Sequence, residues 1–227
     1  MHKELKMNTE IVMASKRPGI YRNYIKRLLD IFCSLLALFV LFPFLVIVVI
    51  LVRINLGSPV FFFQKRIGKD GKEFTLYKFR IMTEEKDENG EYLPDKVRLT
   101  PLGRKLRSMS IDELPQLLNI LKGEMSVIGP RPLPVSFMEF YTEEEKRRHE
   151  IKPGLSSITG ISGRNTMSWK EKFEKDVWYA DHVSFLLDCK IVIKTIVVVL
   201  KREGIYDASG GTREKFLGTH DEITIKK

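Results

Sequence analysis

An apolar run of 22 residues constrains this chain more than any other feature. Between Ile31 and Val52 the sequence carries no formal charge and reads IFCSLLALFVLFPFLVIVVILV. As a helix rising ~1.5 Å per residue, the run would be about 33 Å long, enough to reach across a bilayer core of roughly 30 Å. The sequence has no second run of this kind, which excludes a polytopic carrier or channel. Because no small-residue cleavage site follows it, we expect the segment to stay in the mature protein.

The charges around this run and a proline inside it bear on its topology. Basic residues flank it on both sides, at Lys16, Arg17, Arg22, Lys26, Arg27, Arg53, Lys65, Arg66 and Lys69. The positive-inside rule places such flanks on the cytoplasmic side, and a straight span would translocate one of them. Pro43 removes a backbone donor and clashes with the preceding turn, so it kinks or breaks a helix. We expect either a re-entrant helix that bends at Pro43 and leaves on the side it entered, or a kinked transmembrane helix.

The composition of the 227 residues limits the class of protein further. Hydrophobic residues make up 44% of the chain, which excludes a disordered protein. Lysine and arginine number 38 against 29 acidic residues, giving a formal charge of +9. Since basic residues flank the apolar run, we ascribe the surplus to anionic lipid rather than to nucleic acid. Cys33 and Cys189 lie far apart in apolar stretches and are expected to be reduced, and no pair of histidines has zinc-ligand spacing with them.

Several secondary-structure elements can be predicted after the apolar run. Two aromatic and β-branched runs, at 59–64 and 72–80, surround an Asp-Gly turn and predict a β-hairpin. Strand alternation places Lys78 and Arg80 on one face, which indicates either an anion site or a solvated edge. Leucine spacing predicts a helix over 99–121. A second apolar run predicts a helix over 186–200, in the core or at a membrane interface.

Two short motifs combine charged residues with helix-start signals or prolines. In SIDELPQ, Ser110 and Glu113 have the spacing of a capping box, so Asp112 and Glu113 could simply mark a helix start. Alternatively, two carboxylates at this place could hold Mg²⁺ or provide a nucleophile. In IGPRPL, two prolines hold Arg131 in place, which suits a bidentate phosphate clamp or a rigid turn with an exposed arginine.

Four segments stand in a fixed order behind the apolar run. They are KFR at 78–80, SIDELPQ at 110–116, IGPRP at 128–132, and GRN at 163–165 followed by Trp169 and DVWY at 176–179. From about Tyr24 to Gly218 the chain resembles the monotopic phosphoglycosyl transferases, bacterial sugar transferases that start glycoconjugate assembly. The resemblance implies a re-entrant helix at the cytoplasmic face of the inner membrane. It also implies transfer of sugar 1-phosphate from a UDP-sugar to a polyprenyl phosphate such as undecaprenyl phosphate, with Mg²⁺ required and UMP released.

The resemblance also assigns roles to residues. Asp112 would attack the sugar-bound phosphorus and form a covalent phosphosugar intermediate, and Glu113 would assist with metal or proton handling, so both would lie near Mg²⁺. The other residues expected to bind substrate or phosphate are Lys78, Arg80, Arg131, Asp176, Arg164 and Asn165. A carboxylate that attacks a diphosphate needs cations nearby to offset the repulsion between like charges, and the basic members of this set would meet that need.

We therefore expect an α+β, mainly helical fold: a small membrane-associated catalytic domain with a β-hairpin, an N-terminal re-entrant (helix-break-helix) segment and interfacial amphipathic helices. The expected organisation is a flexible lead-in at 1–20, the membrane segment at 21–56, the cytoplasmic-face catalytic domain at 57–218 and a tail at 219–227. The alternative is a membrane-anchored interaction protein without enzymatic activity. An ordinary metal-dependent glycosyltransferase is disfavoured because no Asp-x-Asp occurs. The sequence leaves open which sugar is transferred and whether the chain forms a homo-oligomer.

Overall fold

The computed structural model describes residues 19–162 and 167–201. The predicted lead-in up to residue 18, the predicted site residues Arg164 and Asn165, and the predicted tail at 219–227 lie outside these ranges. The α-helices are α2 (Lys26–Leu56), α3 (Asp95–Arg98), α4 (Pro101–Ser108), α5 (Gln116–Lys122), α6 (Glu143–Lys146), α7 (Trp169–Asp181) and α8 (Phe185–Lys201). The strands are β1 (Phe61–Ile67), β2 (Glu73–Phe79), β3 (Ser126–Ile128) and β4 (Gly154–Ser156). Short helical turns are η1 (Tyr21–Ile25), η2 (Lys69–Gly71), η3 (Ile111–Glu113), η4 (Val135–Phe140) and η5 (Arg147–Glu150).

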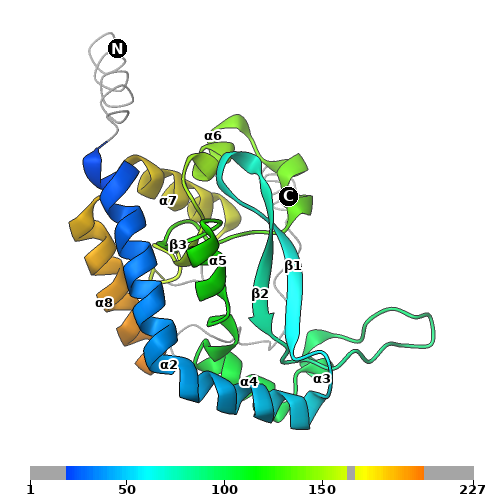
Figure 1. The fold of residues 1–227 in the computed structure, drawn as a ribbon. Helices are drawn as coiled ribbons and strands as arrows, with labels where there is room; N and C mark the ends of the chain where they lie inside the picture. The colour runs from blue at the N-terminus through cyan, green and yellow to red at the C-terminus, as the bar shows by residue number, and fades with distance from the viewer. Residues whose placement is uncertain (1–18, 163–166, 202–227) are drawn as a thin grey trace.

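The predicted fold class is confirmed: helices dominate, and β1 and β2 form the expected antiparallel hairpin (Figure 1). Phe61 pairs with Phe79 at the open end of the hairpin. At its tip, Asp70 and Gly71 have positive φ angles of 56° and 73°, the conformation for which an Asp-Gly turn is suited. The only other strand pair in the described residues is the short parallel pair of β3 and β4. Both cysteines are free, as expected.

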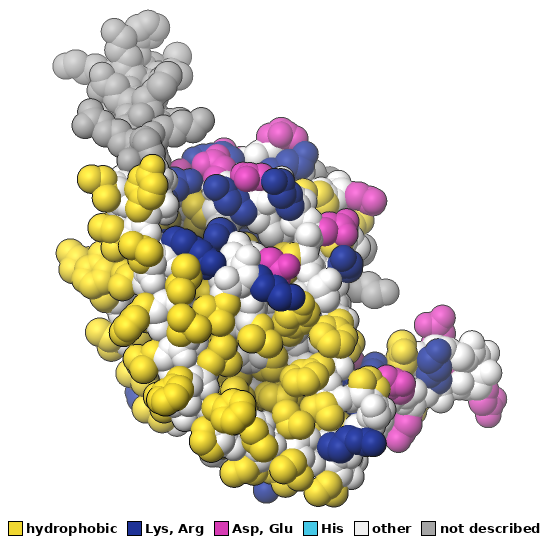
Figure 2. Space-filling model, in the orientation of Figure 1, with side chains coloured by type: hydrophobic (Ala, Val, Ile, Leu, Met, Phe, Trp, Pro, Cys, Tyr) yellow, Lys and Arg dark blue, Asp and Glu magenta, His cyan; other side chains and the backbone are white. Residues whose placement is uncertain are grey.

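Helix α2 is continuous over 31 residues with Pro43 in its interior. Figure 1 shows that α2 bends strongly part way along its length, and proline is the usual cause of such a bend. Pro43 therefore bends one helix instead of separating two, a difference from the predicted helix-break-helix segment. The segment Tyr21–Leu56 is apolar and long enough to cross a membrane, yet only 11% of its most apolar window is buried. Most side chains of α2 are therefore exposed, and Figure 2 shows a broad apolar surface on this face of the molecule. An exposed apolar surface of this kind is typical of an interface with a membrane or another protein.

The N-terminal part of α2 is fastened to the rest of the domain by polar contacts. The guanidinium of Arg27 donates to the carbonyls of Ile120 and Leu121, at 2.5 and 2.9 Å, in the last turn of α5. Oδ1 of Asp30 accepts hydrogen bonds from Ser126 Oγ and the backbone N–H of Val127, at 3.0 and 2.8 Å. These contacts fix α2 against α5 and the start of β3.

The C-terminal part of α2 packs on the same domain through apolar contacts. Val48 and Val52 are buried in one cluster with Phe79 of the hairpin and Leu106 of α4. Burying a side chain of this size contributes about 1.5–3 kcal/mol. Both ends of the bent helix are thus attached to one folded unit.

The predicted single helix over 99–121 is wrong, because the chain forms α4 and α5 with a break between them. Ser110 has a φ angle of 55°, in the left-handed region that ends a regular helix. Pro115 precedes the first residue of α5 and lacks the N–H that a continuing helix would need. The break places η3, with its two carboxylates, between the two helices.

Candidate active site

The carboxylates of Asp112 and Glu113 lie in η3, and they do not cap a helix. The side chain of Ser110 makes no capping hydrogen bond, so the capping-box interpretation of this segment is wrong. Asp112 is buried, with 5% of its surface exposed. The burial of the Asp112 carboxylate is not explained by helix capping, but the charged side chains around it indicate a role.

Two cations from distant segments converge on Glu113. Lys78 Nζ, from β2, lies 2.7 Å from Glu113 Oε1, and Arg131 Nη2, from the loop after β3, lies 2.8 Å from the same oxygen. The Lys78 ammonium also lies 4.0 Å from Oδ2 of Asp112. The structure therefore brings together four residues that the sequence analysis had assigned to one site.

The surroundings of Asp112 alter its acidity. Burial is the main cause that raises the pKa of Asp112 above the ordinary range of aspartate, and the charge of Glu113 acts in the same direction. The cations of Lys78, Arg107 and Arg131 oppose this shift. A carboxylate that is poorly solvated but surrounded by cations has the character expected of a nucleophile toward a phosphorus atom.

Arg66 of β1 belongs to this site, although the sequence analysis counted it only as a basic flank. Its pKa is lowered to about 10 by burial and by the nearby charge of Arg131, while Glu113 opposes the shift. Its Nε is buried without a hydrogen-bond partner among the described residues, and its Nη2 donates to Gln64 Oε1 at 2.5 Å. Pairing of Phe62 with Lys78 puts Arg66 on the same hairpin face as Lys78, a signal that only the strand register reveals.

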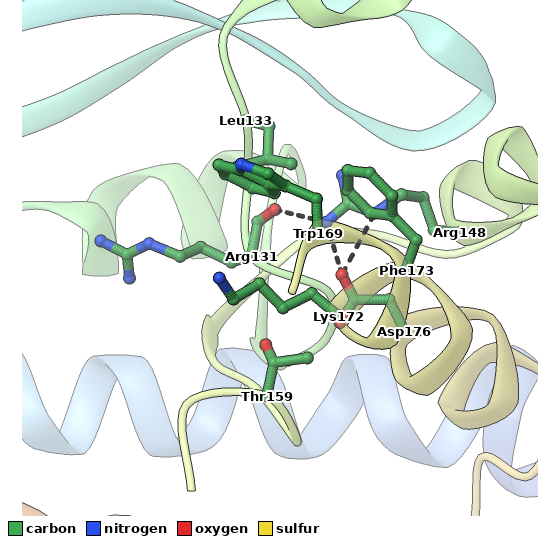
Figure 3. A pocket seen from close by; sticks show the side chains of 8 residues that line it. All are labelled: Arg131, Leu133, Arg148, Thr159, Trp169, Lys172, Phe173 and Asp176. Carbon is green, nitrogen blue, oxygen red and sulfur yellow. Dashed lines mark hydrogen bonds and ion pairs between the residues drawn. The ribbon is translucent and has the colours of Figure 1, made fainter. Parts of the chain in front are cut away.

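Asp176, which the sequence predicts to bind substrate, pairs in the structure with Arg148. Its Oδ2 accepts from Arg148 Nε and Nη2, at 3.1 and 2.7 Å, and both side chains are buried. Arg148 Nη2 also donates to the backbone carbonyl of Arg131 at 2.8 Å (Figure 3). Asp176 thus positions Arg131 through Arg148. The sequence analysis missed Arg148, because it stands in a run of charged residues that resembles a solvated helix.

Arg80, predicted to bind phosphate, has a different set of partners. Its guanidinium donates to the carbonyls of Leu56 and Ser58, just where α2 ends. It also lies 3.8 Å from the carboxylate of Glu84. These contacts attach the end of α2 to the hairpin, and the assignment of Arg80 to phosphate binding stays a prediction. Arg164 and Asn165 lie outside the described residues.

The residues present fit Mg²⁺ only if it arrives with a phosphate ligand. No group of three or more histidine, cysteine, aspartate or glutamate side chains suited to a metal occurs in residues 19–162 and 167–201. Asp112 and Glu113 offer two adjacent carboxylates. Mg²⁺ is commonly held by one or two carboxylates, with substrate phosphates and water completing its shell.

A buried Asp112 beside Glu113, with the cations of Lys78 and Arg131 close by, is an arrangement suited to chemistry on phosphate groups. The sequence model of the bacterial sugar transferase family matches residues 21–202, and this chain belongs to that family. It is 51% identical over 197 residues to the uncharacterized sugar transferase EpsL of Bacillus subtilis, covering 87% of this chain and 98% of that relative.

Two further relatives carry more specific names. The chain is 37% identical to the exopolysaccharide production protein ExoY of Sinorhizobium fredii, over 80% of this chain and 88% of the relative. It is 40% identical to a UDP-glucose:undecaprenyl-phosphate glucose-1-phosphate transferase of Klebsiella pneumoniae, over 75% of this chain and 39% of that longer protein.

Proposed function

We propose that this protein transfers sugar 1-phosphate from a UDP-sugar to undecaprenyl phosphate, giving an undecaprenyl-diphosphate sugar and UMP. This reaction would start the assembly of a bacterial glycoconjugate on the membrane. The observation that carries the proposal is the buried Asp112 beside a Glu113 held by Lys78 and Arg131 at 2.7 and 2.8 Å. The name of the Klebsiella relative supports the same donor and acceptor classes.

In the first step, an Oδ atom of Asp112 attacks the phosphorus that carries the sugar. The new Oδ–P bond forms while the bond from that phosphorus to the bridging oxygen breaks, and UMP leaves with the bonding electrons. In the second step, an oxygen of the lipid phosphate attacks the same phosphorus and releases the Asp112 carboxylate. The atoms balance without any further reactant, because each phosphorus–oxygen bond broken is replaced by another.

The cations make this attack possible. Two negatively charged groups must approach one another, and Arg66, Lys78 and Arg131 provide fixed positive charge where the diphosphate would lie. When bound with the donor, Mg²⁺ would neutralise further charge on the diphosphate. Arg148 and Asp176 would keep Arg131 in place during both steps.

We also propose that α2 enters and leaves the membrane on the cytoplasmic side. Both parts of the helix, around Arg27 and around Val52, are attached to the same folded domain. A helix that crossed the bilayer would place those parts on opposite sides. The basic flanks and the cytosolic donor favour the cytoplasmic side, with the bend of α2 in the bilayer.

The test is nucleotide release by the full chain in detergent with Mg²⁺, undecaprenyl phosphate and a panel of UDP-sugars. We expect UMP from one or a few donors, and loss of its release in Asp112→Asn. The matched control is Asp70→Asn at the exposed hairpin tip, where asparagine also accepts a positive φ. Release of UDP would identify ordinary glycosyl transfer and contradict the proposal. No release from any donor would favour the interaction-protein alternative.

A further inference from the structure

A cavity lies at the other end of α5 from Asp112 and Glu113. Its volume is about 660 Å³, in the range of ligand-binding pockets. Its charged lining consists of five basic residues and two carboxylates: Arg22, Lys26, Arg27, Lys69, Lys152, Asp30 and Glu150. None of the proposed catalytic residues lines it. Gly123, at the end of α5 nearest the cavity, stands eleven positions after Asp112 in a mostly helical stretch, which corresponds to roughly 16 Å of helix.

Most of the charges in the cavity already have partners. The two carboxylates are engaged, Asp30 by Ser126 and Val127 and Glu150 by Arg147. Three of the cations are engaged as well: Arg22 by the carbonyl of Ala180 and by Glu150, Lys26 by Asp188, and Arg27 by the last carbonyls of α5. Engaged carboxylates leave little negative charge for the remaining cations.

Lys69 and Lys152 are the cations left over. Neither ammonium makes a hydrogen bond or ion pair with any residue in the described parts of the chain. A Cβ atom placed on Gly123 would lie 3.5 Å from Arg27 Nη2 and 3.6 Å from Lys152 Nζ, so these two cations converge on one point. Burial, followed by the charge of Arg27, lowers the pKa of Lys152; the charge of Lys69 acts in the same direction, and the charge of Asp30 opposes the shift. Like charges gathered in this way favour an anion between them.

The position of the cavity indicates which anion. Leu28 and Phe32, which follow Arg27 within about a turn and a half of α2, are 66% and 64% exposed. Figure 2 shows basic side chains along the upper edge of the apolar surface that α2 helps to form. An anion held at the edge of a membrane-facing apolar surface is at the level of the lipid headgroups.

We propose that this cavity binds the phosphate headgroup of an anionic membrane phospholipid, with Lys69 and Lys152 as its main ligands and Arg27 beside them. The acyl chains would lie along the exposed apolar side chains of α2. The site is separate from the one that would take undecaprenyl phosphate, and its occupation does not depend on the transferase reaction.

The test measures lipid binding by the full chain in a neutral detergent, with no sugar donor present. Native mass spectrometry would follow titrations with phosphatidylglycerol, phosphatidylcholine and inorganic phosphate. The test variant is Lys69→Gln/Lys152→Gln. The matched control is Lys96→Gln/Lys170→Gln, which removes the same charge from two exposed lysines away from the cavity. A thermal melt of each variant checks that it is folded.

We expect one saturable phosphatidylglycerol site whose dissociation constant rises roughly 30-fold in the test variant, since each basic residue contributes a factor of about five. The control should change it by less than about twofold. Should the double variant fail to fold, Lys69→Gln alone, at an exposed position, should still weaken binding about fivefold. Equal weakening in test and control, equal binding of phosphatidylcholine, or inorganic phosphate competing for the site at comparable affinity would overturn the proposal.

Discussion

The buried pair of Arg148 and Asp176 gives the sharpest prediction about stability and activity together. Arg148 is 2% exposed, and its guanidinium donates to Asp176, to the Tyr141 hydroxyl and to the Arg131 carbonyl. Asp176→Asn removes the only charge in the described residues that forms an ion pair with this cation. Breaking a buried pair from one side costs about 3–5 kcal/mol, because the remaining charge stays desolvated. For a chain of this size the melting temperature should fall by about 6–20 °C.

The matched control is Glu143→Gln, which breaks the exposed ion pair of Lys146 and Glu143. Exposed pairs contribute about 0–1 kcal/mol, so the melting temperature of this variant should change by no more than about 4 °C. Both variants are compared by thermal unfolding in the same detergent and by UMP release at saturating donor.

A double variant separates stability from positioning. Arg148→Met with Asp176→Leu replaces the buried pair by apolar groups, which commonly restores the stability lost in a single variant. UMP release should stay low even so, since nothing then donates to the carbonyl of Arg131. The reasoning is refuted if Asp176→Asn melts within about 4 °C of wild type, or if the double variant regains full activity.

Four further predictions concern single residues. Lys78→Met should lower the rate of UMP release by roughly 100-fold, since it removes a cation from the reacting charges, and a single-turnover assay would measure the loss. Asp112→Asn should raise the melting temperature near pH 7, because the ionised carboxylate is buried against its preference; this gain should vanish below pH ~4, where aspartate is protonated in both folded and unfolded states. For the same reason, UMP release by the wild type should decline on acidification at a pH above the ordinary aspartate pKa, a pH–rate profile being the check. Arg80→Gln should lower the melting temperature by several degrees through loss of the contacts at the end of α2, while the Michaelis constant for the donor stays unchanged.

The elements that could be predicted from the sequence are those with long or strongly local signals. The apolar run predicted α2, and alternation around Asp70 and Gly71 predicted the hairpin. The second apolar run, at 186–200, predicted α8. Leucine spacing failed over 99–121, because the left-handed Ser110 and the missing N–H of Pro115 override a helical pattern of side chains.

The sequence predicted some residues of the candidate site and missed others. Resemblance of short motifs found Asp112, Glu113, Lys78 and Arg131, which the fold brings together. The sequence analysis did not identify Arg148, because the burial of this residue depends on packing between segments 28 residues apart in sequence. The same packing pairs Asp176 with Arg148, which in turn donates to the carbonyl of Arg131.

The carboxylates of Asp112 and Glu113 differ in their surroundings, and this difference can be tested. Glu113 is held by Lys78 and Arg131, whereas no side chain lies within hydrogen-bond distance of the buried Asp112 among the contacts of the described residues. Glu113→Gln should weaken the hold on Arg131 and so slow the reaction without abolishing the nucleophile. Asp112 alone should carry a covalent adduct.

The most direct test of the central claim is to trap that adduct. The full chain is incubated with Mg²⁺ and its preferred UDP-sugar in the absence of undecaprenyl phosphate, then digested and analysed by mass spectrometry. The account predicts UMP release of about one equivalent and a sugar-phosphate mass on the peptide containing Asp112, absent in Asp112→Asn and removed when undecaprenyl phosphate is added. UMP release that begins only when the lipid phosphate is present, with no adduct on this peptide, would contradict it and show direct transfer between the two substrates.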